Sequence, residues 1–247
     1  MKVSLFVSCL TDTFYPRMAI AAVKVLDRLG CSVHFPQKQT CCGQPMYKNG
    51  FHREAAVLAK RMIDALDGGE QVVSLSGSCG AMIRAYGDEL LADDARLRDA
   101  ARELAGRTHE FSQFLVDVLH VDLRELGVKW PGVVTYHYSC HLRQLGVTDQ
   151  TDRLLKQIEG LEYRRLANRE QCCGFGGTFA TKFAELSGAI VAEKVAAIGK
   201  TGAGTVISNE AGCGMNIAGA CRRAGCDVRF KSVAEVIAEG LGLLERK

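Results

Sequence analysis

Cysteines are the residues of this sequence whose type and spacing are most suited to chemistry. Adjacent pairs followed by glycine occur twice, as TCCGQP at residues 40–45 and as QCCGFG at residues 171–176. The chain has eleven cysteines among 247 residues. A long chain with an odd number of cysteines favours metal ligation or thiol chemistry over a framework of disulfides.

The cysteines recur at a nearly constant interval along the chain. Cys9, Cys41 and Cys42 reappear at one common offset as Cys140, Cys172 and Cys173, and Cys79 reappears at nearly the same offset as Cys213. Such self-similarity indicates an internal duplication. The first quartet is Cys9, Cys41, Cys42 and Cys79, and the second quartet is Cys140, Cys172, Cys173 and Cys213.

The two halves also share an expected order of strands and helices. Each opens with an apolar run that ends at its first cysteine, VSLFVSC (3–9) or VVTYHYSC (133–140). In the first half, the hydrophobic pattern predicts helices over 17–29, 52–66 and 110–119, and strands over 32–36 and 72–76. In the second half, it predicts helices over 149–158, 179–198 and 232–244, and strands over 161–166 and 205–208.

Strands that alternate with helices are typical of parallel βαβ units. We therefore expect an α/β fold of two lobes related by a pseudo-twofold axis, each with a parallel sheet. The boundary is expected at the KWPG break, Lys129–Gly132, which gives a first lobe over 1–129 and a second over 130–247.

In both halves the repeated cysteines follow strands, so they should meet at the carboxyl edge of a parallel sheet. Four thiolates in one place repel one another unless a cation compensates, and a metal centre does so. Four thiolates suit Zn²⁺ or an iron–sulfur cluster. Neither quartet contains the C-x₂-C spacing typical of zinc, so we favour iron–sulfur and keep zinc as the alternative.

The same stretches resemble the cysteine-rich CCG domain family. MKVSLFVSCL, FPQKQTCCGQP, SGSCGAM, QCCGFGGTF and GCGMNI carry the resemblance, which covers essentially the whole chain. The family includes the cysteine-rich subunit of heterodisulfide reductase and the iron–sulfur subunits of glycolate and glycerol-3-phosphate dehydrogenases. Within it, the sequence is most similar to members that act in lactate utilisation.

This resemblance implies an iron–sulfur, electron-transfer subunit that works with two partner subunits to oxidise L-lactate to pyruvate. One [4Fe–4S] cluster per lobe, held by the two quartets, is the expected cofactor. In heterodisulfide reductase the last cysteine belongs to a CxxC, whereas Met82 and Asn216 stand at that fourth place here. This departure weakens the case for heterodisulfide chemistry and leaves open a second lobe without a cluster.

The remaining candidates carry weaker signals. His141, beside Cys140, is the one candidate for a catalytic role, as a proton carrier, whereas His137 is expected to be simply hydrogen-bonded. The glycines of GFGGT (174–178) predict a tight turn rather than a phosphate loop. Three cysteines lie outside the repeat and are expected to pack in the core: Cys31, Cys221 and Cys226.

Composition narrows the other possibilities. A net charge of +3 without a basic stripe gives no indication of nucleic acid. The N-terminal apolar run is short and interrupted, so we expect neither a signal peptide nor a membrane span, and the default compartment is the cytoplasm, where thiols stay reduced. No flavin or nicotinamide fingerprint is visible, so turnover by this chain alone is not expected. A thiol–disulfide redox subunit, a glycolate oxidase iron–sulfur subunit and a zinc-stabilised module remain as alternatives.

Overall fold

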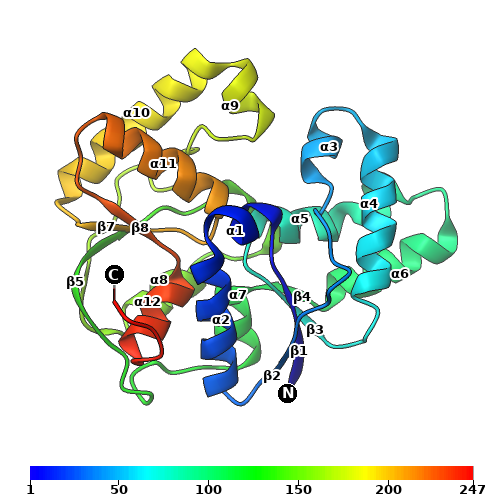
Figure 1. Cartoon of the computed structure of the whole chain (residues 1–247), viewed down its shortest axis with the longest axis horizontal. Coiled ribbons are helices and arrows are strands. Elements are labelled where there is room, and N and C mark those ends of the chain that lie inside the picture. Colours follow the sequence, from blue (N-terminus) through cyan, green and yellow to red (C-terminus); the bar gives the residue numbers. More distant parts are fainter. Residues whose placement is uncertain (247) are drawn as a thin grey trace.

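Two four-stranded parallel sheets form the framework of the protein (Figure 1). The computed structural model describes residues 1–246. The first sheet has the order β2-β1-β3-β4, with β1 (Lys2–Phe6), β2 (Ser32–His34), β3 (Gln71–Ser74) and β4 (Thr108–Glu110). The second has the order β6-β5-β7-β8, with β5 (Lys129–Tyr136), β6 (Glu159–Tyr163), β7 (Thr205–Ile207) and β8 (Arg229–Lys231). The two orders are equivalent, which confirms the predicted α/β fold of two related lobes.

Helices connect the strands in both lobes. The first lobe contains α1 (Cys9–Phe14), α2 (Pro16–Arg28), α3 (Gln44–Lys48), α4 (His52–Ala65), α5 (Gly77–Ala85), the π-helical turn η1 (Tyr86–Leu90), α6 (Ala95–Gly106), α7 (Phe111–Gln113) and the π-helical turn η2 (Phe114–Val118). The second contains the 3₁₀-helix η3 (Cys140–Leu145), α8 (Gln150–Leu155), α9 (Thr178–Lys182), α10 (Ala184–Thr201), α11 (Ala211–Arg223) and α12 (Val233–Gly240).

Local sequence accounts for several of these boundaries. Pro16 begins α2, where its fixed φ suits the first turn and its missing N–H has no partner to lose. Gly30, at φ +78°, follows the end of this helix and turns the chain toward β2. Ser232 and Glu235 form a reciprocal capping box that begins α12.

Other boundaries differ from the sequence-based expectation. The helix predicted over 179–198 is interrupted at Phe183 and forms α9 and α10. The helix predicted over 110–119 is a single turn that continues as a π-helical turn. Strand β4 and helix α6 were not predicted. At three residues, β4 is too short to show alternation of apolar and polar side chains.

The last helix of each lobe packs against the other lobe. Helix α12, from the end of the chain, lies along α2 near the N-terminus (Figure 1). In the same way, α7 and η2 pack against α8 of the second lobe. The largest apolar core accordingly contains residues of both halves, including Val25, Phe114, Leu154 and Ile237. The lobes are therefore interlocked through their terminal helices.

The expected break between the lobes lies within regular structure. Residues Lys129–Gly132 begin strand β5, and Lys129 already pairs with Glu159 of β6. The division at residues 129 and 130 stays a prediction. Within residues 1–246, none of the helices has the length and apolar character needed to cross a membrane.

Candidate metal centres

All eight repeated cysteines lie after the carboxyl ends of strands, and four of them lie in the first turn of a helix. In the first lobe, Cys9 begins α1 and Cys79 lies in the first turn of α5. Two serines set these helix starts: Ser8 Oγ accepts from the N–H of Thr11, and Ser76 Oγ accepts from the N–H of Cys79. The capping serines therefore fix the backbone that carries Cys9 and Cys79.

The first quartet combines a buried pair with a more open pair. The Sγ atoms of Cys42 and Cys79 lie 3.1 Å apart, and both side chains are buried. Cys41 is half-buried and Cys9 is exposed. Cys9 and Cys41 interact closely enough to change each other's pKa. The four sulfurs are thus gathered at one place with one side open.

The second quartet repeats this arrangement. The Sγ atoms of Cys173 and Cys213 are 3.0 Å apart and buried. Cys140 is half-buried, Cys172 is exposed, and the two thiols interact with each other. The structure therefore brings together both sets of residues singled out from the sequence. Their role as metal ligands stays a prediction.

Hydrogen bonding among the thiols distributes their protons unevenly. In the first quartet, hydrogen bonds from Cys42 and then from Cys9 lower the pKa of Cys41. The pKa of Cys9 is raised, chiefly by its hydrogen bond to Cys41 and then by burial. The pKa of Cys42 is raised, chiefly by its hydrogen bond to Cys41 and then by the one with Cys79. A metal ion that takes several thiolates must displace these protons, so metal binding at such a site is coupled to pH.

The second quartet follows the same rule. The pKa of Cys172 is lowered, chiefly by a hydrogen bond from Cys140 and then by one from Cys173. The pKa values of Cys140 and Cys173 are raised, for each chiefly by the hydrogen bond to Cys172. In both lobes the first cysteine of the CCG pair is thus the preferred thiolate.

The glycine after each cysteine pair is required by the backbone. Gly43 and Gly174 have φ +85° and +80°, where a side chain is strained. A Cβ on Gly174 would also lie 2.7 Å from the carbonyl oxygen of Ser187 in α10. The turn lets two adjacent thiols face one centre, since an extended chain would point them in opposite directions.

Different side chains fix the two turns. Tyr86 donates a hydrogen bond from its hydroxyl to the carbonyl oxygen of Cys42 at 2.7 Å. Asn216 donates from Nδ2 to the carbonyl oxygen of Cys173, also at 2.7 Å. Asn216, which stands where a further cysteine is found in heterodisulfide reductase, therefore holds the turn. Its counterpart Met82 is buried in the apolar core of the first lobe.

A histidine lies beside the buried cysteines of the second quartet. His137 follows β5, is 1% exposed, and lies with Cys173 and Cys213 in a group whose potential ligand atoms are within 4.8 Å of one another. Neither ring nitrogen has a hydrogen-bond partner, contrary to the expectation of a simply hydrogen-bonded histidine. Burial and then Lys194 lower the pKa of His137 to about 3, so its imidazole is neutral.

Lys194 was not singled out from the sequence. It is fully buried in α10, and its ammonium donates to the carbonyl oxygen of Asn168 at 2.8 Å. The sequence signal that could have found it is the repeat itself, because the equivalent position of the first half is occupied by the apolar Ile63.

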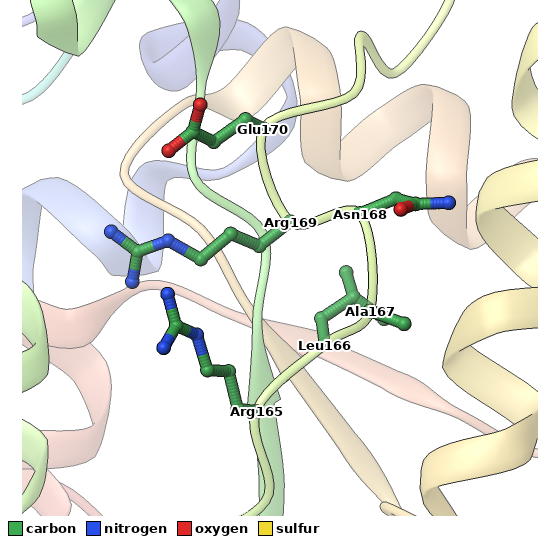
Figure 2. Close-up of a pocket in the computed structure, with 6 residues that line it drawn as sticks. All are labelled: Arg165, Leu166, Ala167, Asn168, Arg169 and Glu170. Carbon is green, nitrogen blue, oxygen red and sulfur yellow. The ribbon is translucent and has the colours of Figure 1, made fainter.

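The segment that carries Asn168 lines a pocket of about 500 Å³ (Figure 2). Figure 2 shows Arg165 and Arg169 on one side of this segment and Asn168 on the opposite side. Arg169 forms an ion pair with Asp152, and its guanidinium stacks over Tyr138. The arginine is therefore already paired, and the pocket itself contains none of the repeated cysteines.

His141 lies between the lobes and beside Cys140. Its Nδ1 is 3.5 Å from Cys140 Sγ, and its Nε2 is 3.0 Å from the Lys48 ammonium of the first lobe. Burial and then Lys48 lower the pKa of His141 to about 4. It lines a pocket of about 370 Å³ together with Lys48 and Arg84. A neutral imidazole at this place can accept a proton, but its catalytic role stays a prediction.

The three cysteines outside the repeat are packed among apolar side chains. Cys31 is buried in the core shared by the lobes, and Cys221 is buried in the core of the second lobe. Cys226 is half-buried against that second core. Their surroundings are those of small apolar side chains.

The chemistry of the donor atoms decides which group fits the two sites. Each lobe gathers four sulfur atoms, and no group of potential ligands found among residues 1–246 contains a carboxylate, so the donors do not suit a hard cation such as Ca²⁺ or Mg²⁺. Sulfur donors fit Zn²⁺ and iron–sulfur clusters. The residues present therefore fit an iron–sulfur centre in either lobe, with Cys9, Cys41, Cys42 and Cys79 as ligands in the first and Cys140, Cys172, Cys173 and Cys213 in the second.

Comparison with known proteins also finds the duplication in this chain. The sequence matches the CCG family, described as a cysteine-rich domain, over residues 3–84 and again over 134–218. It is 47% identical over 238 residues to lactate utilization protein A of Halalkalibacterium halodurans, covering 96% of each chain. It is 45% identical to lactate utilization protein A of Geobacillus kaustophilus and 43% identical to lactate utilization protein A 1 of Bacillus cereus, covering 96% of this chain and 98% of each relative. By these matches the chain, which carries the cysteine-rich CCG domain twice, belongs to the lactate utilization protein A family.

Proposed function

We propose that this chain is an iron–sulfur, electron-transfer subunit of a lactate-oxidising system, with one [4Fe–4S] cluster in each lobe. The observation that supports the proposal most is the gathering of four thiols twice in one chain, each time with two buried Sγ atoms in close contact, 3.1 Å apart in the first lobe and 3.0 Å in the second. When bound, such clusters accept and donate single electrons. The relatives named above are lactate utilization proteins, which supports L-lactate as the compound whose oxidation to pyruvate supplies the electrons.

The protein's own residues contribute ligation, burial and access. The buried cysteine of each CCG pair and the cysteine of the following helix hold the inner side of the site, whereas Cys9 and Cys172 lie at the surface. An inner side closed to water and an outer side near solvent suit a centre that exchanges electrons with a docked protein. The partners proposed are the two further subunits that the family resemblance implies, and turnover is expected only in their presence.

The thiols also bear on the compartment. All eleven cysteines are free, and several have interacting neighbours at short distance. A compartment that keeps thiols reduced, such as the cytoplasm, suits this chemistry.

The decisive experiment measures iron and acid-labile sulfide in protein purified without oxygen. Wild-type protein is expected to contain iron and sulfide for two clusters. Cys42→Ser and Cys173→Ser should each lose the content of one cluster, and the double variant should lose both. Cys221→Ser, a buried cysteine outside the quartets, is the matched control and should keep both clusters.

The same measurement separates the alternative functions. Stoichiometric zinc without iron would contradict the proposal in favour of a zinc-stabilised module. A metal-free chain that reduces disulfides would support a thiol–disulfide enzyme, which the low pKa of Cys41 and Cys172 would suit. Co-purification with the partner subunits and comparison of L-lactate with glycolate then test the substrate.

A further inference from the structure

The two quartets share their cysteines but not the side chains around them. Three residues before the first cysteine stands Phe6 in the first half and His137 in the second. Twenty-one residues after the CCG pair's second cysteine stands Ile63 in the first half and Lys194 in the second. Phe6 and Ile63 pack with the buried cysteines of the first quartet in an apolar core. The first site thus has apolar side chains at the two positions where the second has His137 and Lys194.

His137 has no interaction that explains its place in the protein. Its side chain is 1% exposed, and both ring nitrogens lack a hydrogen-bond partner. Leaving a buried polar group unpaired destabilises the folded protein, so such groups normally have a partner in the functional state. An apolar side chain at the same place, as in the first lobe, would avoid this cost.

The position of the ring supplies the missing partner. A ring nitrogen of His137 and the Sγ atoms of Cys173 and Cys213 lie within 4.8 Å of one another, and this is the one group of three or more potential ligands with this geometry found among residues 1–246. Imidazole nitrogen is a common ligand of iron and of zinc. The buried ammonium of Lys194 uses one of its three donors on the carbonyl oxygen of Asn168, and it lies close enough to the cysteines of the second quartet to interact with them electrostatically. A buried cation beside the site favours a centre with net negative charge.

We infer that His137 is a nitrogen ligand of the metal centre in the second lobe, in place of one of the four cysteines of that quartet, which makes this centre chemically distinct from the all-cysteine centre of the first. This inference rests on the proposed function, because it requires an iron–sulfur centre in the second lobe. Replacement of sulfur by imidazole nitrogen in an iron–sulfur centre raises its reduction potential, and the Lys194 ammonium acts in the same direction. Electrons are accordingly expected to reside on the second centre in preference to the first.

The test is pulsed EPR spectroscopy of the reduced full-length chain, in a background that isolates one centre at a time. Cys42→Ser removes the first centre and leaves the second, and Cys173→Ser does the reverse. In the Cys42→Ser background we expect a strong nitrogen hyperfine coupling that changes from the ¹⁴N to the ¹⁵N pattern when the protein contains ¹⁵N-histidine. The Cys173→Ser background should show no histidine coupling, since Phe6 occupies the corresponding place.

Two variants identify the histidine. His137→Phe, which reproduces the first site, should abolish the coupling, and His141→Leu, which reproduces Leu10 of the first half, should retain it. A coupling that survives in His137→Phe or disappears in His141→Leu overturns the inference. If a variant does not hold iron, isotope labelling of the unsubstituted chain still decides, because a spectrum unchanged by ¹⁵N-histidine excludes a histidine ligand.

The two proposals fail in different ways. A chain without iron contradicts the proposed function and this inference together. A chain with iron for two clusters but no histidine coupling contradicts the inference alone.

Discussion

Ser76 and Glu210 occupy corresponding places in the two lobes and are hydrogen-bonded to each other. Each stands three residues before the last cysteine of its quartet. The Ser76 hydroxyl lies 2.9 Å from Oε2 of Glu210, which also accepts from the backbone N–H of Ser78. The pseudo-twofold relationship between the lobes therefore brings the starts of the two cysteine-bearing helices α5 and α11 into direct contact.

This contact should contribute to the docking of the lobes. Glu210→Ala removes the partner of the buried Ser76 hydroxyl and of the partly buried Ser78 N–H, so we expect a loss of about 1–3 kcal/mol in the free energy of unfolding. Glu210→Gln keeps an acceptor oxygen and should lose less. Urea unfolding measures both, with the exposed Glu125→Ala as control. Equal stability of the alanine variant and the wild type would contradict this role.

Glu110 should make stability depend on pH. Its carboxyl is 1% exposed, and burial raises its pKa to about 7. Because this folded-state value lies above the ordinary value of about 4.5, the folded chain binds more protons between these pH values. Stability attributable to Glu110 is therefore lost as pH rises from about 4.5 through 7, by about 3 kcal/mol in total.

The comparison that isolates this effect uses Glu110→Gln, which does not titrate. The difference in unfolding free energy between variant and wild type should move in favour of the variant from about pH 5 to about pH 8, with both proteins in the same metal state. His109, His137 and His141, whose pKa values are lowered chiefly by burial, act in the opposite direction but are common to both chains. A difference that is independent of pH would show that the carboxyl titrates normally.

The repeat of cysteines predicted more of the structure than any local pattern did. The interval from Cys9 to Cys140, which is the same as that from Cys41 to Cys172, indicated a duplication, and equivalent parallel sheets follow from it. The strands β4 and β8 are very short and contain polar side chains such as His109 and Lys231, so neither has a hydrophobic period to recognise. Their place is set by pairing with β3 and β7, which no local sequence records.

The candidate site was predictable in its sulfur atoms and not in its surroundings. Cysteines at strand ends converge because the carboxyl ends of parallel strands lie at one edge of the sheet, and the alternation of strands and helices in the sequence predicts such a sheet. The packing of α12 on α2 depends instead on the fit of two surfaces from opposite ends of the chain. The hydrogen bond from Arg17 of α2 to Glu239 of α12 is one contact of this kind. That His137 and Lys194 replace the apolar Phe6 and Ile63 is apparent only when the two halves are aligned residue by residue.

Glu239 should be the polar anchor of the interlock between the lobes. Its carboxylate accepts from Arg17 at 3.0 Å, from Lys231 at 2.7 Å and from Trp130 Nε1 at 2.9 Å. Glu239→Ala leaves the buried Lys231 ammonium without its anion, so we expect a loss of about 3 kcal/mol in the free energy of unfolding.

A matched pair on the surface provides the control. Lys129 and Glu159 form an ion pair at 2.9 Å in which the side chains are 64% and 68% exposed. Glu159→Ala should change stability by less than about 1 kcal/mol, because solvent screens an exposed pair. Similar losses from the two substitutions would show that Glu239 has no special part in holding α12 to the first lobe.

Gly174 should be indispensable for the geometry of the second quartet. Its φ of +80° strains any side chain, and a Cβ there meets the backbone oxygen of Ser187 at 2.7 Å, which α10 cannot easily move. Gly225 has a similar φ of +69° with open space around it and lies outside the quartets. Gly225→Ala should therefore lose about 1–2 kcal/mol in the free energy of unfolding from backbone strain alone.

Gly174→Ala should lose more stability and, in addition, the iron of the second centre, because the collision displaces the turn that orients Cys172 and Cys173. Iron analysis with urea unfolding of both variants separates strain from collision, and a Gly174→Ala chain that retains full iron would show that the turn tolerates a side chain.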